Sequence, residues 1–238
     1  MAERGLKRVR VRYPRIRLGL KLLAAALTVC LVWVSAPRLL HRLDFFRIRR
    51  VEIAGLQYLA PAKVTGALGL APKATVFDDL AAAGRRVRSL PGVVSATVKR
   101  RLPGTLEIVV VEAVPVALAP RSGGMALLDS GGNILPYDPA ASAPDLPVAA
   151  SVDRRVARVL ASVQRHDPAL FSKVRTAWRV KEDVLLDVDG RRLWFGAAVT
   201  AEDIRAVMAV AQDLARQGRT YEELDGRYAG QVIVRAGA

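Results

Sequence analysis

Apolar and polar residues alternate over several short stretches of the chain, which is the pattern of strands with one buried face. In the first half, two segments with helical spacing separate these stretches, and their ends carry proline, glycine or paired acids. The predicted elements are a strand at 50–54, a helix between Pro61 and Gly69, a helix from Asp78-Asp79 to Pro91, and strands at 94–98 and 106–110. This order predicts a small α+β domain, which we place at 44–116.

The second half predicts a mixed β-sheet domain with flanking helices at 117–236. Asp189-Gly190 lies between two alternating runs, which is a strong signal for a two-residue type I′ hairpin turn. Thr200 and Asp203 resemble a capping box that opens a helix. The predicted elements are short strands at 125–128 and 134–135, a helix at 153–165, strands at 174–180, 184–188 and 191–195, a helix from Thr200 to Gly218, and a strand at 231–235.

Near the N-terminus, residues 22–36 form an uncharged, largely apolar run that extends with one interruption to the length needed to cross a bilayer. Basic residues are denser before the run than after it. The positive-inside rule therefore predicts a basic cytoplasmic tail at 1–21, a transmembrane helix at 22–40, and the remainder outside the cytoplasm. The alternatives are a cleaved signal peptide, which Pro37 disfavours directly after a cleavage site at Ala36, and a buried core helix.

Composition and charge exclude several classes of protein. At 52% hydrophobic and 25% charged residues, the chain is neither disordered nor a polytopic membrane protein. A single cysteine, Cys30, excludes a disulfide framework, and the two distant histidines, His41 and His166, make a zinc site unexpected. The formal net charge is +15, and residues 1–43 carry ten basic residues against one acid. Because this charge adjoins the apolar run, it favours anionic lipid over nucleic acid.

The sequence contains none of the glycine-rich phosphate loops, nucleophile elbows or zinc-protease motifs of common enzymes. Asp78-Asp79 fit a helix start, and Asp187 and Asp189 fit a solvated turn. Trp178 and Trp194 lie on strands that are predicted to pair, so we expect both in the core rather than on a ligand platform. We therefore predict that the protein is not an enzyme and holds no cofactor.

Two groups of motifs carry a resemblance to a known family. The first group lies at 51–55, 68–70, 75–77, 90–93, 100–106 and 111–117, and the second at 190–196, 224–228 and 232–235. In this order and spacing, the chain resembles the FtsQ/DivIB family of bacterial cell-division proteins, in which a POTRA domain precedes a β domain. That family usually has Asp-Leu-Arg followed by Tyr or Phe at 225–228, and Gly226 departs from this pattern.

The resemblance implies a non-enzymatic, single-pass scaffold of the divisome, at the inner membrane and the midcell septum, that helps to control septal peptidoglycan synthesis. It implies that the POTRA domain meets other division proteins and that the β domain binds the FtsB/FtsL pair. It implies no cofactor, nucleic acid or small-molecule substrate. POTRA domains also occur in outer-membrane assembly and secretion proteins, so a POTRA-type chaperone or secretion component of the envelope is the alternative function.

The last predicted strand leaves little chain to cover its far edge, so this edge is expected to accept a strand from a partner. The family's partner surface lies at this end of the β domain. By matched position, the resemblance assigns partner binding to Arg227, Tyr228, Gln231, Val232, Ile233 and Val234. Arg227 is expected to pair with an acidic partner residue, and Tyr228 to act as a rigid anchor. The alternative is that the strand merely completes the sheet and Tyr228 packs inward.

Overall fold

The computed structural model describes residues 23, 25–31, 33, 44–142, 145–228 and 230–237. Within this part of the chain, no helix is both long and apolar enough to cross a membrane. The predicted tail at 1–21, more than half of the predicted transmembrane helix at 22–40, and His41 lie outside the described residues. The membrane topology therefore stays a prediction.

The chain divides into two compact units, each built from separate stretches of sequence. The first comprises residues up to Glu52, Leu70–Ala81 and Val98–Glu107, and the second comprises the remaining stretches, from Ile53 onward. This division follows packing and does not coincide with the border predicted near residue 116. The independence of 44–116 is therefore a question for a folding experiment.

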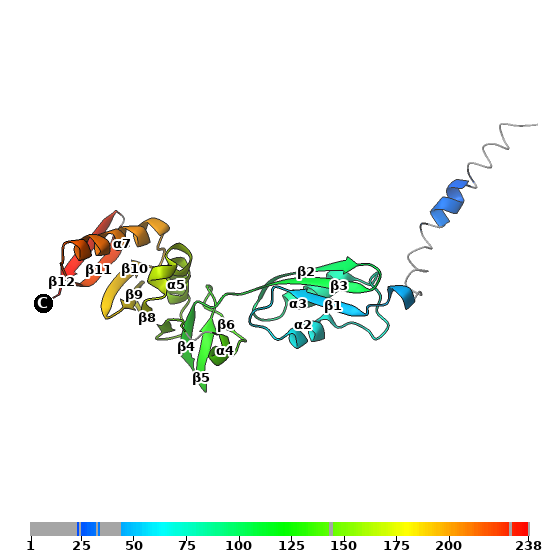
Figure 1. The fold of residues 1–238 in the computed structure, drawn as a ribbon, viewed down its shortest axis with the longest axis horizontal. Helices are drawn as coiled ribbons and strands as arrows, with labels where there is room; N and C mark the ends of the chain where they lie inside the picture. The colour runs from blue at the N-terminus through cyan, green and yellow to red at the C-terminus, as the bar shows by residue number, and fades with distance from the viewer. Residues whose placement is uncertain are drawn as a thin grey trace, which may run out of the picture. The chain divides into compact units, whose positions relative to one another are not determined.

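The strand-helix-helix-strand-strand order predicted for the first half is confirmed (Figure 1). The three strands form one sheet in the order β1-β3-β2. Proline begins the first helix, and Gly69 ends it in the left-handed conformation, with φ 57°. The elements are η1 (Asp44–Phe46), β1 (Arg50–Ala54), α2 (Pro61–Leu68), α3 (Leu80–Arg88), β2 (Val93–Arg101) and β3 (Thr105–Glu112).

Alternation along β3 places Leu106, Ile108 and Val110 in the interior, as predicted, and leaves the intervening Val109 and Val111 exposed. Leu106 packs with Val76 and Leu80 in the core of the first unit. The Asp78 carboxylate accepts hydrogen bonds from the backbone N–H of Thr75, at 3.2 Å, and from the Thr75 hydroxyl, at 2.9 Å, and so closes the turn before α3.

The rest of the chain forms one nine-stranded sheet with the order β12-β11-β10-β9-β8-β7-β4-β5-β6. Helices α5 and α7 bury their apolar residues against one face of it, in a single core cluster (Figure 1). The predicted strands and helices of this half are all found, whereas β4, β7, α4, α6 and β11 were not predicted. The elements are β4 (Ala117–Arg121), β5 (Gly124–Leu128), β6 (Ile134–Leu135), α4 (Pro139–Ser142), β7 (Val148–Ala149), α5 (Arg154–His166), α6 (Pro168–Phe171), β8 (Val174–Val180), β9 (Asp183–Val188), β10 (Arg191–Gly196), α7 (Ala201–Arg216), β11 (Tyr221–Tyr228) and β12 (Gln231–Ala236).

Two local predictions in this half are confirmed in detail. Asp189 and Gly190 both have positive φ, at 53° and 81°, as a type I′ turn requires, and the Asp187 carboxylate accepts the Gly190 N–H. Thr200 and Asp203 form a reciprocal capping box at the start of α7. Both signals depend only on residues within a few positions of one another, which is why the sequence could show them.

The prediction that Trp178 lies in the core is wrong, and the cause is a β-bulge. Strand β8 shifts register against β9 between Val174 and Thr176. The extra residue reverses the facing of the strand beyond it, so that Ala177 points into the core cluster and Trp178 lies half-buried on the opposite face. The same prediction is wrong for Trp194, which lies half-buried on that same opposite face, between the buried Leu193 and Phe195 of β10.

Within the second unit, a buried tyrosine and a buried glutamate hold loops that are distant in sequence. The Tyr137 hydroxyl lies 2.8 Å from the Gly92 carbonyl oxygen and 3.1 Å from that of Ala113, and its ring stacks on Tyr58 at 5.0 Å. The Glu112 carboxylate accepts three backbone N–H groups, those of residues 57–59, at 2.7 to 2.9 Å. Gly92 has φ 85°, and a Cβ there would lie 2.8 Å from the Tyr137 ring, so only glycine fits this turn.

This arrangement predicts a loss of stability at high pH. Burial, together with the charge of Glu112, raises the pKa of Tyr137 to about 12. The unfolded value is about 10. Between these two values the folded state keeps a proton that the unfolded state has lost, so this contribution is complete below about pH 10 and falls as the pH rises towards 12. Chemical unfolding at a series of alkaline pH values should show this slope, and Tyr137→Phe should flatten it. An equal slope in both proteins would contradict the assignment.

Candidate partner-binding site

Among the residues that the structure describes, β12 forms one end of the nine-stranded sheet and pairs only with β11, in antiparallel orientation. Its other side is an open edge, where alternate N–H and C=O groups have no neighbouring strand. The side chains near this edge include apolar ones that are well exposed, with Tyr228 at 51%, Ile233 at 47% and Val234 at 36%. Val232 is half-buried and packs against the core cluster. The six sequence-predicted residues therefore lie on the last two strands of the sheet, β11 and β12, and Tyr228 points to solvent rather than inward.

Strand β11, which the sequence did not predict, connects this edge to the rest of the sheet. It pairs in parallel with β10, after the crossover through α7, and in antiparallel with β12. Among the central residues of β11, Leu224 alone places a large apolar side chain in the core. Its neighbours Glu223 and Asp225 lie on the other face of the sheet. A strand with so few apolar residues gives no periodic signal in the sequence.

Gly226, which departs from the motif usual in the family, faces α7. A Cβ built there would lie 2.5 Å from Val207 Cγ2 and 3.6 Å from the Phe195 ring. Val207 is fully buried and occupies the space that a larger residue at 226 would need. The departure therefore leaves the strand intact, because the helix fills the space from the other side.

This packing predicts a compensating pair of substitutions. Gly226→Leu should destabilise the chain by about 1–3 kcal/mol through overpacking. In a Val207→Ala background the same change should cost less, with a coupling of about 0.5–3 kcal/mol between the two positions. Chemical unfolding of the four proteins in the cycle measures both values. Equal costs in the two backgrounds would show that the two positions do not compete for space.

Arg227 makes its ion pairs within the chain. The sequence predicts an acidic partner residue for it, whereas its guanidinium contacts Asp225, at 2.6 Å and 2.8 Å, and Asp183 of β9, at 2.8 Å. It also lies 4.8 Å from the centre of the Trp194 ring. These hydrogen bonds raise the pKa of Arg227 and lower the pKa of Asp225. Arg227 therefore fixes the end of β11 against its neighbours and holds Tyr228 beside the open edge.

The face of the sheet opposite the helices carries a row of residues that the sequence analysis missed. Strand pairing aligns Trp178 with Leu185, Leu185 with Trp194, Trp194 with Asp225, and Asp225 with Ile233. The row thus runs from β8 to the edge strand, and its two tryptophans and Leu185 are half-buried. The expectation that the strands of the two tryptophans pair is wrong, because β9 lies between β8 and β10, and the bulge in β8 hid the common facing of the two side chains.

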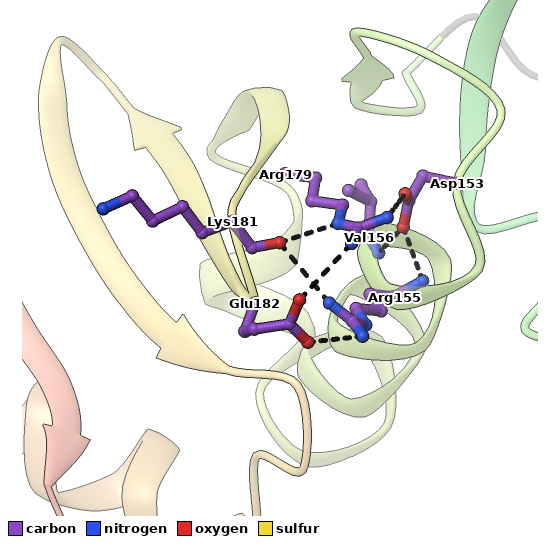
Figure 2. Close-up of polar contacts among 6 residues, drawn as sticks. All are labelled: Asp153, Arg155, Val156, Arg179, Lys181 and Glu182. Carbon is purple, nitrogen blue, oxygen red and sulfur yellow. Dashed lines mark hydrogen bonds and ion pairs between the residues drawn. The ribbon is translucent and has the colours of Figure 1, made fainter.

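A second cluster of charges joins the N-terminus of α5 to the turn between β8 and β9 (Figure 2). Asp153 accepts the backbone N–H groups of Arg155, at 2.7 Å, and Val156, at 3.2 Å, and pairs with Arg179. Burial would raise the pKa of Asp153, but these hydrogen bonds outweigh it and hold the pKa below its usual value. Arg155 pairs with Glu182, and Arg179 donates to the Lys181 carbonyl. Asp153, Arg155, Arg179 and Glu182 all have partners inside the cluster, so the cluster holds the turn to the helix.

No group of three or more His, Cys, Asp or Glu side chains placed to hold a metal ion occurs among the described residues. The position of β12 at the end of the sheet and the exposed Tyr228, Ile233 and Val234 suit this edge to binding another chain through backbone and apolar contacts.

Comparison with known proteins gives the same family for both halves of the chain. The family described as "POTRA domain, FtsQ-type" matches residues 46–113. The cell division protein FtsQ of Mycobacteroides abscessus is 31% identical over 212 residues, which cover 86% of this chain and 67% of that protein. This chain belongs to the FtsQ family.

Two other FtsQ proteins match over shorter stretches. That of Syntrophotalea carbinolica is 27% identical over 178 residues, which cover 74% of this chain and 59% of the relative. That of Mycolicibacterium smegmatis is 34% identical over 115 residues, which cover 48% of this chain and 34% of the relative. Since this chain spans about two thirds or less of these three FtsQ proteins, partners of the whole proteins enter only as proposals. FtsQ membership supports a division-site membrane protein with a POTRA domain.

Proposed function

We propose that this chain is a non-enzymatic scaffold of the divisome that binds a partner strand along the open edge of β12. The observation that carries the proposal is the position of β12 at the end of the sheet, with Tyr228, Ile233 and Val234 exposed beside it. A partner strand added there satisfies the free backbone groups, while the exposed side chains supply apolar contacts. The family implies FtsB/FtsL-like subunits as the partner.

The charges near this edge favour an acidic partner segment. Arg235 of β12 and Arg192 of β10 both approach the buried carboxylate of Glu223, at 3.3 Å and 3.8 Å. Two arginines share this carboxylate, and both are more than half exposed, so each guanidinium is also open to an acidic residue of a partner. The POTRA domain at 46–113 is free to meet other division proteins, and through these contacts the scaffold influences septal peptidoglycan synthesis.

The scaffold also requires an anchor, for which we propose the segment 22–40, with the tail at 1–21 in the cytoplasm. Protease added to spheroplasts should then digest residues 44–238 and spare a short N-terminal stub. Protection of the C-terminus, or recovery of a soluble form that begins at Pro37, would contradict this topology.

Depletion of the protein in its own bacterium tests the divisome role. Cells should grow as filaments without septa, and the wild-type chain should restore division. A chain whose β12 edge is blocked, present at the same level by immunoblot, should not restore it. Normal septa after depletion would exclude the role, whereas rescue by the blocked chain would exclude only the edge.

A further inference from the structure

One end of the first unit brings together exposed arginines and exposed apolar side chains from two separate segments. The backbone N–H groups of Arg49 and Arg50 both donate to the Gly104 carbonyl, at 2.8 Å and 3.3 Å. This contact places the start of β1 beside the turn that joins β2 to β3. We define the tip patch as Phe45, Arg49, Arg50, Arg100, Arg101 and Leu102.

The apolar members of the tip patch are open to solvent. Phe45, in the short helix η1, is 60% exposed, and Leu102, in the turn after β2, is 61% exposed. Two large, exposed apolar side chains on one end of a small domain are typical of an interface with an apolar phase or partner.

The charge of the tip patch is strongly positive. Arg50 and Arg101 both approach the carboxylate of Glu52, yet their side chains remain 73% and 69% exposed. Arg49 and Arg100 are exposed as well. Asp44, next to Phe45, pairs with Arg47. Among the described residues, Glu52 is the one carboxylate that pairs with any of the four arginines, so the patch keeps a net positive charge that matches a layer of negative charge. Exposed Phe and Leu between arginines match the boundary between headgroups and acyl chains.

The tip patch begins close in the sequence to the proposed membrane anchor, which indicates that it contacts the membrane surface. Asp44 follows the end of the uncharged run at Ala36 by eight residues, which span at most about 28 Å when fully extended. If that run is the anchor, the tip patch is tethered next to the bilayer surface, and its local concentration there is high.

We propose that the tip patch binds anionic phospholipid at the outer surface of the membrane and so fixes the orientation of the POTRA domain on it. This inference rests on the proposed membrane anchor at 22–40. Phe45 and Leu102 insert at the interface, and the four arginines contact lipid phosphates. A POTRA domain held in this way presents its other surfaces to division partners in a constant orientation.

The test uses the full chain, with Cys30→Ser, reconstituted in lipid nanodiscs. An environment-sensitive fluorophore is attached to Leu102→Cys or, as the control, to Lys73→Cys, an exposed position of the same unit. In discs that contain phosphatidylglycerol, the probe at 102 should shift to the blue and be quenched by nitroxide-labelled lipid. The probe at 73 should do neither. High salt should reverse the response, because it screens charges beyond a few ångströms.

Charge reversal separates a specific patch from general attraction. Arg49→Glu with Arg100→Glu should abolish the response at 102, whereas Lys63→Glu with Lys73→Glu, an equal change of charge elsewhere, should leave it. Circular dichroism of both variants confirms that the fold is kept. An equal response in discs of phosphatidylcholine alone, or equal loss in both charge variants, would overturn the proposal.

Failure of the anchor has a different signature. A chain that dissociates from the discs would overturn the proposed anchor, and sedimentation with phosphatidylglycerol vesicles then tests the patch by itself. Vesicle affinity should fall about tenfold or more in Arg49→Glu with Arg100→Glu but not in the matched control. Equal vesicle affinity of the two variants would show that the tip patch does not bind anionic lipid, and this conclusion does not depend on how the chain is anchored.

Discussion

Replacing Tyr228 with alanine should weaken binding of an FtsB-like partner about tenfold or more, which corresponds to about 1.4 kcal/mol. Tyr228 is 51% exposed beside the open edge of β12, so truncation removes an anchor without opening a cavity in the core. Tyr228→Phe keeps the ring and serves as the matched control. Arg227 is a poor choice for this test, because its removal would leave the buried carboxylate of Asp225 unpaired and destabilise the strand.

A proline substitution tests the backbone of the edge separately from its side chains. Successive N–H groups along a strand point to opposite sides, so of Val232 and Ile233 one N–H faces β11 and the other faces the open edge. Proline at the open position, in Val232→Pro or Ile233→Pro, keeps the pairing with β11 and should prevent addition of a partner strand. Proline at the other position removes a hydrogen bond of the sheet and should lower the melting temperature.

Thermal melts identify which proline variant stays folded, and titration with the partner then measures its affinity. The folded variant should also bind at least about tenfold more weakly than wild type. If this variant and Tyr228→Ala both stay folded and both bind the partner normally, the binding edge lies elsewhere in the protein.

Leu106→Ala should destabilise the chain by about 2–5 kcal/mol, the usual cost of a large-to-small change in a core. Leu106 is fully buried in the core of the first unit, against Val76 and Leu80. Leu102→Ala is the matched control, since Leu102 is exposed in the adjoining turn and its loss should change stability by no more than about 0.5 kcal/mol. Chemical unfolding of the purified chain measures both. A loss of stability smaller than that of the control would show that Leu106 does not contribute to the core.

The predicted independence of 44–116 can be tested with this fragment in isolation. This fragment lacks Leu127, Leu135 and Tyr137, which pack against Tyr58, Leu59 and Val93 in the chain. We expect the fragment to fold, with lower stability than the same residues have in the chain, because that apolar surface becomes exposed. An unfolded circular-dichroism spectrum of the fragment would contradict the boundary near 116.

The sequence by itself determined the features that depend on neighbouring residues. The turn at Asp189-Gly190, the cap at Thr200 and the helix end at Gly69 each follow from the conformations that two to four adjacent residues permit. The order of elements in the first half follows in the same way from alternation and from proline and glycine positions. These signals act over one turn or one strand, so they can be found without the fold.

Only the tertiary structure decided the features that depend on contacts between distant segments. The bulge in β8 placed Trp178 on the face opposite the core, and one extra residue is invisible in a simple alternation. Strand β11 forms between β10 and β12, with Leu224 in the core and Gly226 against Val207 of α7, although its sequence shows no alternating apolar pattern. Arg227 pairs with carboxylates on β9 and β11, which are brought together by the fold. Strand β12 is an edge strand because of the strand order of the whole sheet. Such choices are set by which side chains fill the same space, and that is determined when the chain packs.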